Sequence, residues 1–300
     1  MLLTIGLAIL VMLALGVCFA MLLGWANVAW KVDVPLQLRQ LTDAMPGANC
    51  GGCGYIGCAE YAEAVFRGEA PPDKCPVGGA AVARHVAEIM GIDLQETLPY
   101  RPVVHCGADY DCRLKRAEYT GERTCGAANL VAGVQGCTYG CLGFGDCEWA
   151  CQFDAVKMVN GLAVIDYDKC TGCGACAKAC PRHIISMVPF KAERIVVVAC
   201  SSKDPGKVVR SVCTVGCIGC GICQKLNELF TVTDNLASIN YDHYDAQADF
   251  APVLAKCPRQ TLIYVGKPSA KDLAAVAGEE LPERVEADFK TTVDDADYRG

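Results

Sequence analysis

The segment Cys170-Thr-Gly-Cys173-Gly-Ala-Cys176-Ala-Lys-Ala-Cys180-Pro181 decides the fold of this protein. Its C-x₂-C-x₂-C-x₃-C-P spacing is a known ligand pattern for iron–sulfur clusters, in which each iron takes one cysteine thiolate. The whole chain holds 22 cysteines among 300 residues, and they lie in short runs whose spacing is awkward for disulfide geometry. Clustered thiols in a chain of this length therefore predict metal or iron–sulfur ligation.

A second copy of the same unit follows along the chain. Cys137-Thr-Tyr-Gly-Cys141 matches Cys213-Thr-Val-Gly-Cys217, segment 160–168 matches segment 234–242, and Cys180-Pro-Arg matches Cys257-Pro-Arg. Each copy predicts a ligand loop, a short helix, a β-hairpin, a second ligand loop, a short helix and a strand. We therefore expect two tandem ferredoxin-like modules of the α+β class.

The second copy has lost half of its ligands in a coordinated way. Asn227 stands where the first copy has Cys151, Tyr244 stands where it has Cys170, and the cysteines that follow Cys170 are missing too. In two-cluster ferredoxins the fourth cysteine of each run binds the other cluster. These losses therefore remove one cluster completely and leave the other complete, so the first module should hold two clusters and the second module one.

We call this exchange of the fourth cysteine between paired clusters the crossing rule. With it, the sequence predicts four [4Fe–4S] sites, within a range of three to five. Site 1 takes Cys50, Cys53, Cys58 and Cys75; site 2 takes Cys137, Cys141, Cys147 and Cys180; site 3 takes Cys151, Cys170, Cys173 and Cys176; site 4 takes Cys217, Cys220, Cys223 and Cys257. Cys213 competes for a place in site 4 because it aligns with Cys137. Zinc is the alternative metal, although zinc sites usually use two C-x₂-C pairs.

Six cysteines remain outside these sites: Cys18, Cys106, Cys112, Cys125, Cys200 and Cys213. Cys106 and Cys200 each end a strand-like segment just before a module. A candidate fifth site therefore comprises Cys106, Cys125, Cys200 and Cys213, with buried structural thiols as the alternative. No residue is expected to be catalytic, and the sequence contains no phosphate-binding loop or dinucleotide fingerprint. The net charge of −7 excludes a strongly basic nucleic-acid binder.

The N-terminal segment predicts a membrane anchor. Residues 1–30 carry no charged side chain, and this run exceeds the roughly 20 apolar residues that span a bilayer. A cleaved signal peptide is the alternative, but the basic start of such a peptide is missing. Trp25 and Trp30 suit an interfacial belt, and Lys31 and Arg39 follow, which favours a cytoplasmic C-terminal side. We expect a single-pass protein of the cytoplasmic (inner) membrane with its cluster domains in the cytoplasm.

The expected domain organisation has six parts. They are a transmembrane anchor (1–29), a small helical 4Fe–4S domain (30–92), a connecting segment with a strand (93–135), a two-cluster ferredoxin-like module (136–190), a degenerate one-cluster module (191–266) and an acidic tail (267–300). The fold class is α+β, with one transmembrane helix preceding the cluster-binding domains.

This arrangement resembles the B subunit of the Rnf ion-translocating electron transport complex. The resemblance rests on Pro46-Gly-Ala-Asn-Cys-Gly-Gly-Cys53, Gly136-Cys-Thr-Tyr-Gly-Cys-Leu-Gly143 and Val215-Gly-Cys-Ile-Gly-Cys220, and it extends to about residue 265. Two features depart from the family pattern. Gln152 follows Cys151 where proline is expected, and the second module has ligands for one cluster where longer members have two.

The resemblance implies part of a translocase, an ion-translocating oxidoreductase. Such a complex moves electrons between reduced ferredoxin and NAD, couples that flow to Na⁺ or H⁺ transport, and contains five other kinds of subunit. This chain would supply a relay of clusters, with soluble ferredoxin as donor or acceptor, and no bond-making chemistry. The alternatives are a membrane-tethered polyferredoxin that serves another reductase or hydrogenase, and a zinc-stabilised scaffold.

Overall fold

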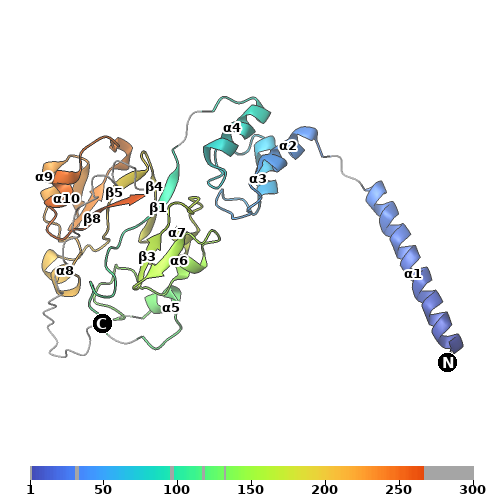
Figure 1. The fold of residues 1–300 in the computed structure, drawn as a ribbon, viewed down its shortest axis with the longest axis horizontal. Helices are drawn as coiled ribbons and strands as arrows, with labels where there is room; N and C mark the ends of the chain where they lie inside the picture. Colours follow the sequence, from blue (N-terminus) through green and yellow to red (C-terminus); the bar gives the residue numbers. More distant parts are fainter. Residues whose placement is uncertain (1, 31–33, 95–97, 117–118, 132, 267–300) are drawn as a thin grey trace.

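A computed structural model describes residues 2–30, 34–94, 98–116, 119–131 and 133–266 of the chain (Figure 1). Within these residues, a long N-terminal helix precedes a small helical domain and two modules built from short helices and two-stranded sheets. This combination confirms the expected α+β class. The expected acidic tail, 267–300, lies outside the described residues.

Helix α1 (Leu2–Ala29) is long and apolar enough to cross a membrane. It contains 28 residues, which gives a length of about 42 Å at 1.5 Å per residue. Its stretch Ile5–Ala29 has a mean hydropathy of 2.8 and buries none of its surface inside the protein. In Figure 1 α1 stands apart from all other elements, as an apolar helix does when lipid is its solvent.

Three helices form the small domain that follows: α2 (Leu36–Ala44), α3 (Cys58–Phe66) and α4 (Gly79–Met90). Leu41, Tyr61 and Val86 are at most 1% exposed and form the centre of its core. Helix α4 ends at Gly91, whose φ of 67° gives the left-handed C-cap that glycine adopts without strain. The helical character of this domain agrees with the prediction from the sequence.

The first module begins with a strand that the sequence placed in the connecting segment. Its elements are β1 (Tyr100–Val104), α5 (Cys125–Asn129), α6 (Asp146–Trp149), β2 (Val156–Val159), β3 (Leu162–Ile165), α7 (Ala175–Ala179) and β4 (Ile185–Pro189). β1 pairs antiparallel with β4, with Val103 opposite Ser186. β2 and β3 form the expected hairpin, turning at Asn160 and Gly161, which both have the positive φ that a type I′ turn needs.

The second module repeats this order. Its elements are β5 (Arg194–Val198), α8 (Gly206–Val212), α9 (Ile222–Leu226), β6 (Phe230–Thr233), β7 (Leu236–Ile239), η1 (Tyr241–His243), α10 (Ala251–Ala255) and β8 (Leu262–Gly266). β5 pairs antiparallel with β8, and β6 pairs with β7 through a turn at Asp234 and Asn235. Both turn residues again have positive φ. The duplication therefore includes the leading strand of each module.

Equivalent hydrogen bonds connect the leading strands to the rest of each module. The Tyr167 hydroxyl donates to the carbonyl of Pro102 in β1 at 2.9 Å, and the Tyr241 hydroxyl donates to the carbonyl of Val196 in β5 at 3.2 Å. Tyr167 and Tyr241 are matched positions in the two copies. The shared contact means that β1 belongs to the first module structurally, although the sequence placed it in the segment 93–135.

The two modules have different cores. The core of the first is rich in thiols, which include Cys106, Cys112, Cys141, Cys147 and Cys176, and Cys213 of the second module joins it. The core of the second is aliphatic and aromatic, and its most buried large side chains are Phe230, Phe250, Ile195, Val196 and Val197. The difference follows from the number of cysteine loops that each module carries.

Candidate metal centres

Cysteines of site 1 belong to the core of the small domain: Cys75 is buried in it, and Cys53 and Cys58 pack against it. Cys75 is 8% exposed, and burial raises the pKa of its thiol, with the nearby Cys53 and Cys58 thiols adding to the effect. The backbone N–H of Gly78 points at the Cys75 Sγ at 3.4 Å, which is the kind of contact that stabilises a bound thiolate. The Asn49 side chain accepts from the N–H of Cys58 at 2.8 Å and fixes the start of α3.

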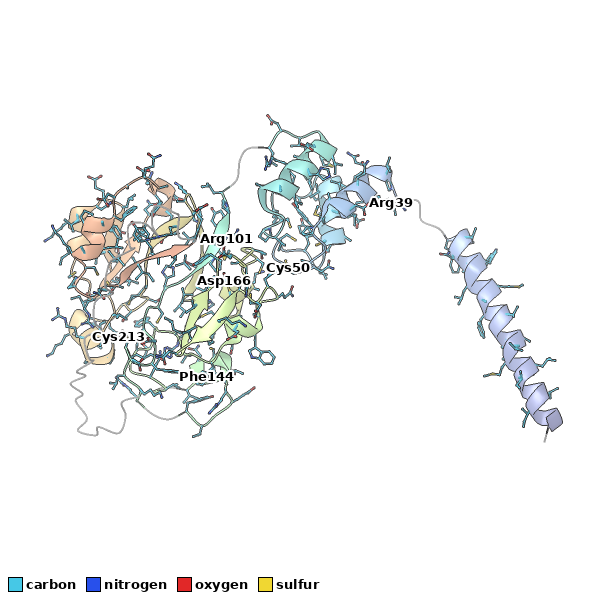
Figure 2. The ribbon with its side chains drawn as sticks, viewed as in Figure 1. Arg39, Cys50, Arg101, Phe144, Asp166 and Cys213 are labelled. Atoms are coloured by element: carbon cyan, nitrogen blue, oxygen red, sulfur yellow. The ribbon has the colours of Figure 1, made fainter. Side chains whose placement is uncertain are left out.

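The loop of site 1 contacts the loop of site 3 in the first module. A Cβ added to Gly52 would lie 3.0 Å from the carbonyl oxygen of Cys173 and 2.9 Å from the ring of Pro76. Only glycine permits this close approach of two backbones. Figure 2 shows Cys50 on the side of the helical domain that faces Arg101 and Asp166. Two groups of thiols from separate domains are thereby brought together.

The structure brings together the four cysteines expected at site 3, which come from both ligand loops of the first module. Burial raises the pKa of the Cys176 thiol to about 12, and Cys170, Cys173 and Cys151 lie near enough to raise it further. The N–H of Ala155 points at the Cys151 Sγ at 3.3 Å. Arg101 donates to the carbonyl of Cys170 and ties this loop to β1.

At site 2 the structure groups a set of cysteines that differs from the expected one in one residue. The cavity there has a volume of about 330 Å³, and its lining includes Cys125, Cys141, Cys147 and Cys180 but not Cys137. Burial raises the pKa of the Cys147 thiol to about 12, and Cys141, Cys125 and Cys180 contribute. Cys125 thus lines this cavity where the sequence predicted Cys137.

The exchange has a simple structural cause. Helix α5 begins at Cys125, and both oxygens of Asp146 accept from its first backbone groups, at 2.7 Å from the N–H of Cys125 and at 2.9 Å from that of Gly126. Asp146 opens α6, which carries Cys147. These hydrogen bonds hold α5 against the site 2 loop, a long-range contact that the spacing of cysteines does not reveal.

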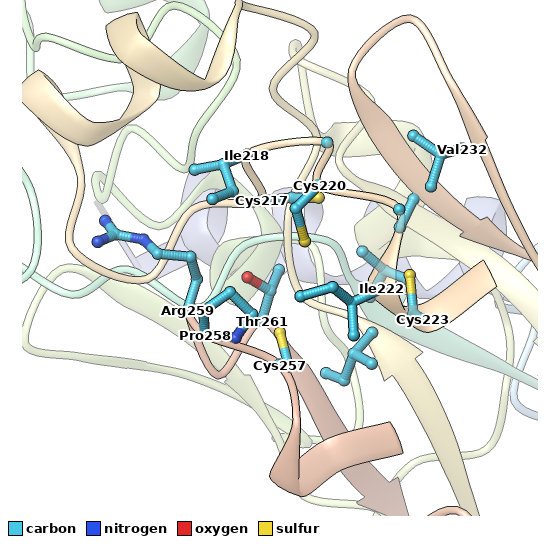
Figure 3. A pocket seen from close by; sticks show the side chains of 15 residues that line it. Cys217, Ile218, Cys220, Ile222, Cys223, Val232, Cys257, Pro258, Arg259 and Thr261 are labelled. Carbon is cyan, nitrogen blue, oxygen red and sulfur yellow. The ribbon is translucent and has the colours of Figure 1, made fainter. Parts of the chain in front are cut away.

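Site 4 contains the four cysteines that the sequence assigned to it. Cys217, Cys220 and Cys223 line one side of a cavity of about 400 Å³, and Cys257 lines the other (Figure 3). Apolar side chains such as Ile218, Ile222 and Val232 complete its wall. Burial raises the pKa of the Cys223 thiol, and the other three cysteines add to this.

The four-cysteine composition of the candidate fifth site also differs from the expectation. Cys106, Cys200 and Cys213 line one cavity together with Cys137, whereas Cys125 lines the cavity of site 2. Cys213 lines this cavity and not the cavity of site 4. The alignment of the two copies could have predicted this grouping of Cys137 with Cys213, because the two are equivalent residues.

The donor sets are all cysteines, and a four-iron cluster takes one thiolate for each iron. Among the residues that the structure describes, no group of three or more His, Cys, Asp or Glu side chains is arranged to hold one metal ion. Thiolate ligands and backbone N–H groups directed at sulfur also fit such clusters.

Histidines take structural roles where their contacts are described. His105 is held between two modules by the carbonyl of Val198 at 2.9 Å and the hydroxyl of Ser186 at 2.7 Å. His85 lies on the exposed surface of α4, 3.6 Å from Glu88. Cys18 lies within α1, and Cys112 is buried in the core of the first module.

Comparison with known proteins supports this chemistry. Residues 45–77, which contain the site 1 cysteines, match a family model for an Fe–S cluster. Residues 163–186 match the 4Fe-4S binding domain. The fold and its thiol groups thus define an iron–sulfur protein with ferredoxin-type 4Fe–4S domains.

Three relatives identify the family. The chain is 40% identical over 76% of its length to the B subunit of a Na⁺-translocating ferredoxin:NAD⁺ oxidoreductase complex from Acetobacterium woodii, of which it covers 69%. It is 41% identical over 85% of its length to the B subunit of a proton-translocating ferredoxin:NAD⁺ oxidoreductase complex from Clostridium ljungdahlii (90% covered). It is 37% identical over 85% to the B subunit of an ion-translocating oxidoreductase complex from Methanosarcina acetivorans (96% covered).

The chain belongs to the family of B subunits of Rnf-type ion-translocating oxidoreductase complexes. It is an iron–sulfur electron-transfer protein that carries [4Fe–4S] clusters and acts as a component of a translocase. Membership in this family and the apolar helix α1 associate it with a membrane.

Proposed function

We propose that this protein passes single electrons between soluble ferredoxin and the NAD-linked part of its complex, whose electron flow drives Na⁺ or H⁺ transport. The names of the relatives from Acetobacterium woodii and Clostridium ljungdahlii support both ferredoxin and NAD as redox partners. The cluster domains lie on the cytoplasmic side of the membrane in this proposal, because Lys31 and Arg39 follow the apolar segment.

The proposed ligands follow the structural groups. Site 1 is held by Cys50, Cys53, Cys58 and Cys75, site 2 by Cys125, Cys141, Cys147 and Cys180, site 3 by Cys151, Cys170, Cys173 and Cys176, and site 4 by Cys217, Cys220, Cys223 and Cys257. Bound clusters supply one-electron transfer. The protein tunes their potentials through burial and through hydrogen bonds to sulfur.

The observation that carries the proposal is the contact between the loops of sites 1 and 3 at Gly52. This contact joins the helical domain to the first module. Within that module Cys176 of site 3 lies near enough to Cys147 of site 2 to raise the pKa of its thiol. Neighbouring thiol groups thus form a continuous series that starts in the domain next to the membrane anchor.

A reconstitution experiment tests the proposal. The complex is purified without oxygen, placed in vesicles and supplied with reduced ferredoxin and NAD⁺. We expect stepwise reduction of the clusters by EPR, NADH formation, and ion uptake only when the cytoplasmic face is accessible to ferredoxin. A Cys53→Ala variant should lose the site 1 signal and NADH formation together.

Two results would contradict the proposal. Full NADH formation in a complex that lacks this chain would make it a polyferredoxin for another reductase. A colourless protein that contains zinc and no iron would make it a scaffold, because zinc has no redox chemistry.

A further inference from the structure

Four cysteines that line none of the other cluster cavities line one cavity between the two modules. They are Cys106, Cys137, Cys200 and Cys213. The cavity has a volume of about 450 Å³, similar to the 400 Å³ of site 4. Cys106 and Cys137 come from the first module, whereas Cys200 and Cys213 come from the second. This position distinguishes the group from every site formed within one module.

The four cysteines are two pairs of matched positions. Cys106 follows β1 by two residues and Cys200 follows β5 by two residues. Cys137 and Cys213 each begin a C-x₃-C segment of the duplicated unit. The group therefore has approximate twofold symmetry: each module contributes one cysteine after its leading strand and one at the start of its ligand loop.

Matched arginines hold the two ligand loops in the same way. Arg182, which follows Cys180-Pro181, donates to the carbonyls of Cys137 at 3.2 Å and Gly140 at 2.6 Å. Arg259, which follows Cys257-Pro258, donates to the carbonyl of Cys213. Both loops are thus fixed with their first cysteine directed to the cavity, while their second cysteine belongs to site 2 or site 4.

The immediate surroundings of the thiols resemble those of sites 1 to 4. The N–H of Cys141 points at the Sγ of Cys106, and the N–H of Ser202 points at the Sγ of Cys200, both at 3.4 Å. A Cβ added to Gly140 would lie 3.5 Å from the Sγ of Cys137 and 3.6 Å from that of Cys106. Gly140 therefore lies directly beside both sulfurs.

The four thiols are buried and close to one another. Burial raises the pKa of Cys213 to about 12 and that of Cys200 to about 11, and the neighbouring cysteines contribute to both shifts. Cys106 contributes to the shift of both residues, and Cys137 and Cys200 contribute to that of Cys213.

We propose that Cys106, Cys137, Cys200 and Cys213 form site 5, a further [4Fe–4S] site shared by the two modules. All four residues line one cavity, and a four-iron cluster takes one thiolate for each iron. The proposal gives Cys137 and Cys213 a role that neither site 2 nor site 4 provides.

The position of site 5 suggests how electrons would cross between modules. Cys141 of site 2 donates its N–H to the Sγ of Cys106, and the backbone N–H of Cys217 of site 4 lowers the pKa of Cys200, against the larger effect of burial. A cluster at site 5 would accept one electron from site 2 and pass it to site 4. This relay role rests on the proposed function, whereas occupancy of site 5 does not.

The test compares single variants of this protein in its complete complex, purified without oxygen. The wild-type chain should contain about twenty iron atoms, and Cys137→Ala, Cys213→Ala and the milder Cys200→Ser should each contain about sixteen. Each variant should lose one and the same EPR signal and keep the signal of site 2, which Cys180→Ala identifies. Cys112→Ala, a buried thiol that does not line this cavity, should retain about twenty.

The outcomes separate this inference from the proposed function. About sixteen iron atoms in the wild type, unchanged in Cys137→Ala and Cys213→Ala, would overturn site 5 and leave the proposed function intact. Loss of the site 2 signal in Cys137→Ala would also overturn it and restore the ligand set that the sequence suggests. One zinc per chain that Cys213→Ala removes would exclude a cluster here. A wild-type chain without iron would defeat both proposals.

Discussion

Phe144 and Cys220 occupy the same position in the two duplicated loops. Each lies three residues after the first loop ligand, Cys141 or Cys217, and three before the last. The first module therefore lacks the middle cysteine of the triplet, and Cys125 enters its site 2 cavity from α5. The ring of Phe144 instead packs on Tyr119, with centroids 5.3 Å apart.

This substitution of one ligand by another predicts a rescue. Cys125→Ala should remove the site 2 cluster, about four iron atoms per chain. Adding Phe144→Cys should restore them, because the triplet then has the spacing found in site 4. Iron and sulfide analysis with EPR measures both steps. If Cys125→Ala alone keeps all its iron, Cys125 is not a ligand.

At the scale of elements, the second module fills the place of its missing cluster with aromatic rings. Tyr244, matched to Cys170 of site 3, stacks on Phe250 with centroids 5.2 Å apart and is 5% exposed. Its hydroxyl accepts from the N–H of Val196 in β5 at 3.0 Å. The matched residue in β1 is Pro102, which has no N–H to satisfy. Loss of the cluster was thus accompanied by a change in hydrogen bonding at the strand.

Tyr244→Phe should therefore destabilise the second module without affecting its iron. The N–H of Val196 would lose its partner inside the core, at a cost of about 1–3 kcal/mol. Denaturant unfolding of the anaerobic protein measures the change, and iron analysis confirms that site 4 is intact. In a double-mutant cycle, Tyr244→Phe should cost less in a Val196→Pro background, since proline removes the unpaired donor. Additive costs would argue against the hydrogen bond as the cause.

The contact at Gly52 predicts a defect in electron transfer between two intact domains. Gly52→Val should push the site 1 loop away from Cys173, because its Cβ would overlap the carbonyl oxygen there. We expect an unchanged iron content. Once site 1 has been reduced, the reduction of site 3 should be severalfold slower, and rapid-freeze EPR measures this rate. Ala81→Val adds the same kind of bulk at an exposed position of α4 and should have no effect. Equal rates in both variants would mean that electrons enter site 3 by another route.

At the scale of the whole molecule, the anchor and the cluster domains are structurally independent. Helix α1 buries no surface against the rest of the described chain. Deleting residues 2–30 should therefore leave the iron content and unfolding free energy of the cluster domains unchanged and should abolish membrane association. Flotation of vesicles with the anaerobic protein, with iron analysis of the unbound fraction, measures both. Loss of iron on deletion would show that α1 supports the domains.

The sequence alone determined the features that depend on local spacing. The apolar run predicted α1, the Cys-Gly patterns predicted ligand loops, and the matched losses at Asn227 and Tyr244 predicted a second module with a single remaining cluster site. Short-range rules suffice for these features because helix periodicity, turn conformation and the ligand triplets all act within a few residues.

Only the tertiary structure decided which distant thiols meet. Cys125 and Cys137 lie 12 residues apart in the chain, yet they line different cavities. The hydrogen bonds of Asp146 to α5 place the first, and Arg182 holds the loop of the second. The hydrogen bonds of His105 with Val198 and Ser201 bring Cys106 toward Cys200. Such groupings depend on packing between elements far apart in sequence. The spacing of cysteines along the chain does not predict that packing.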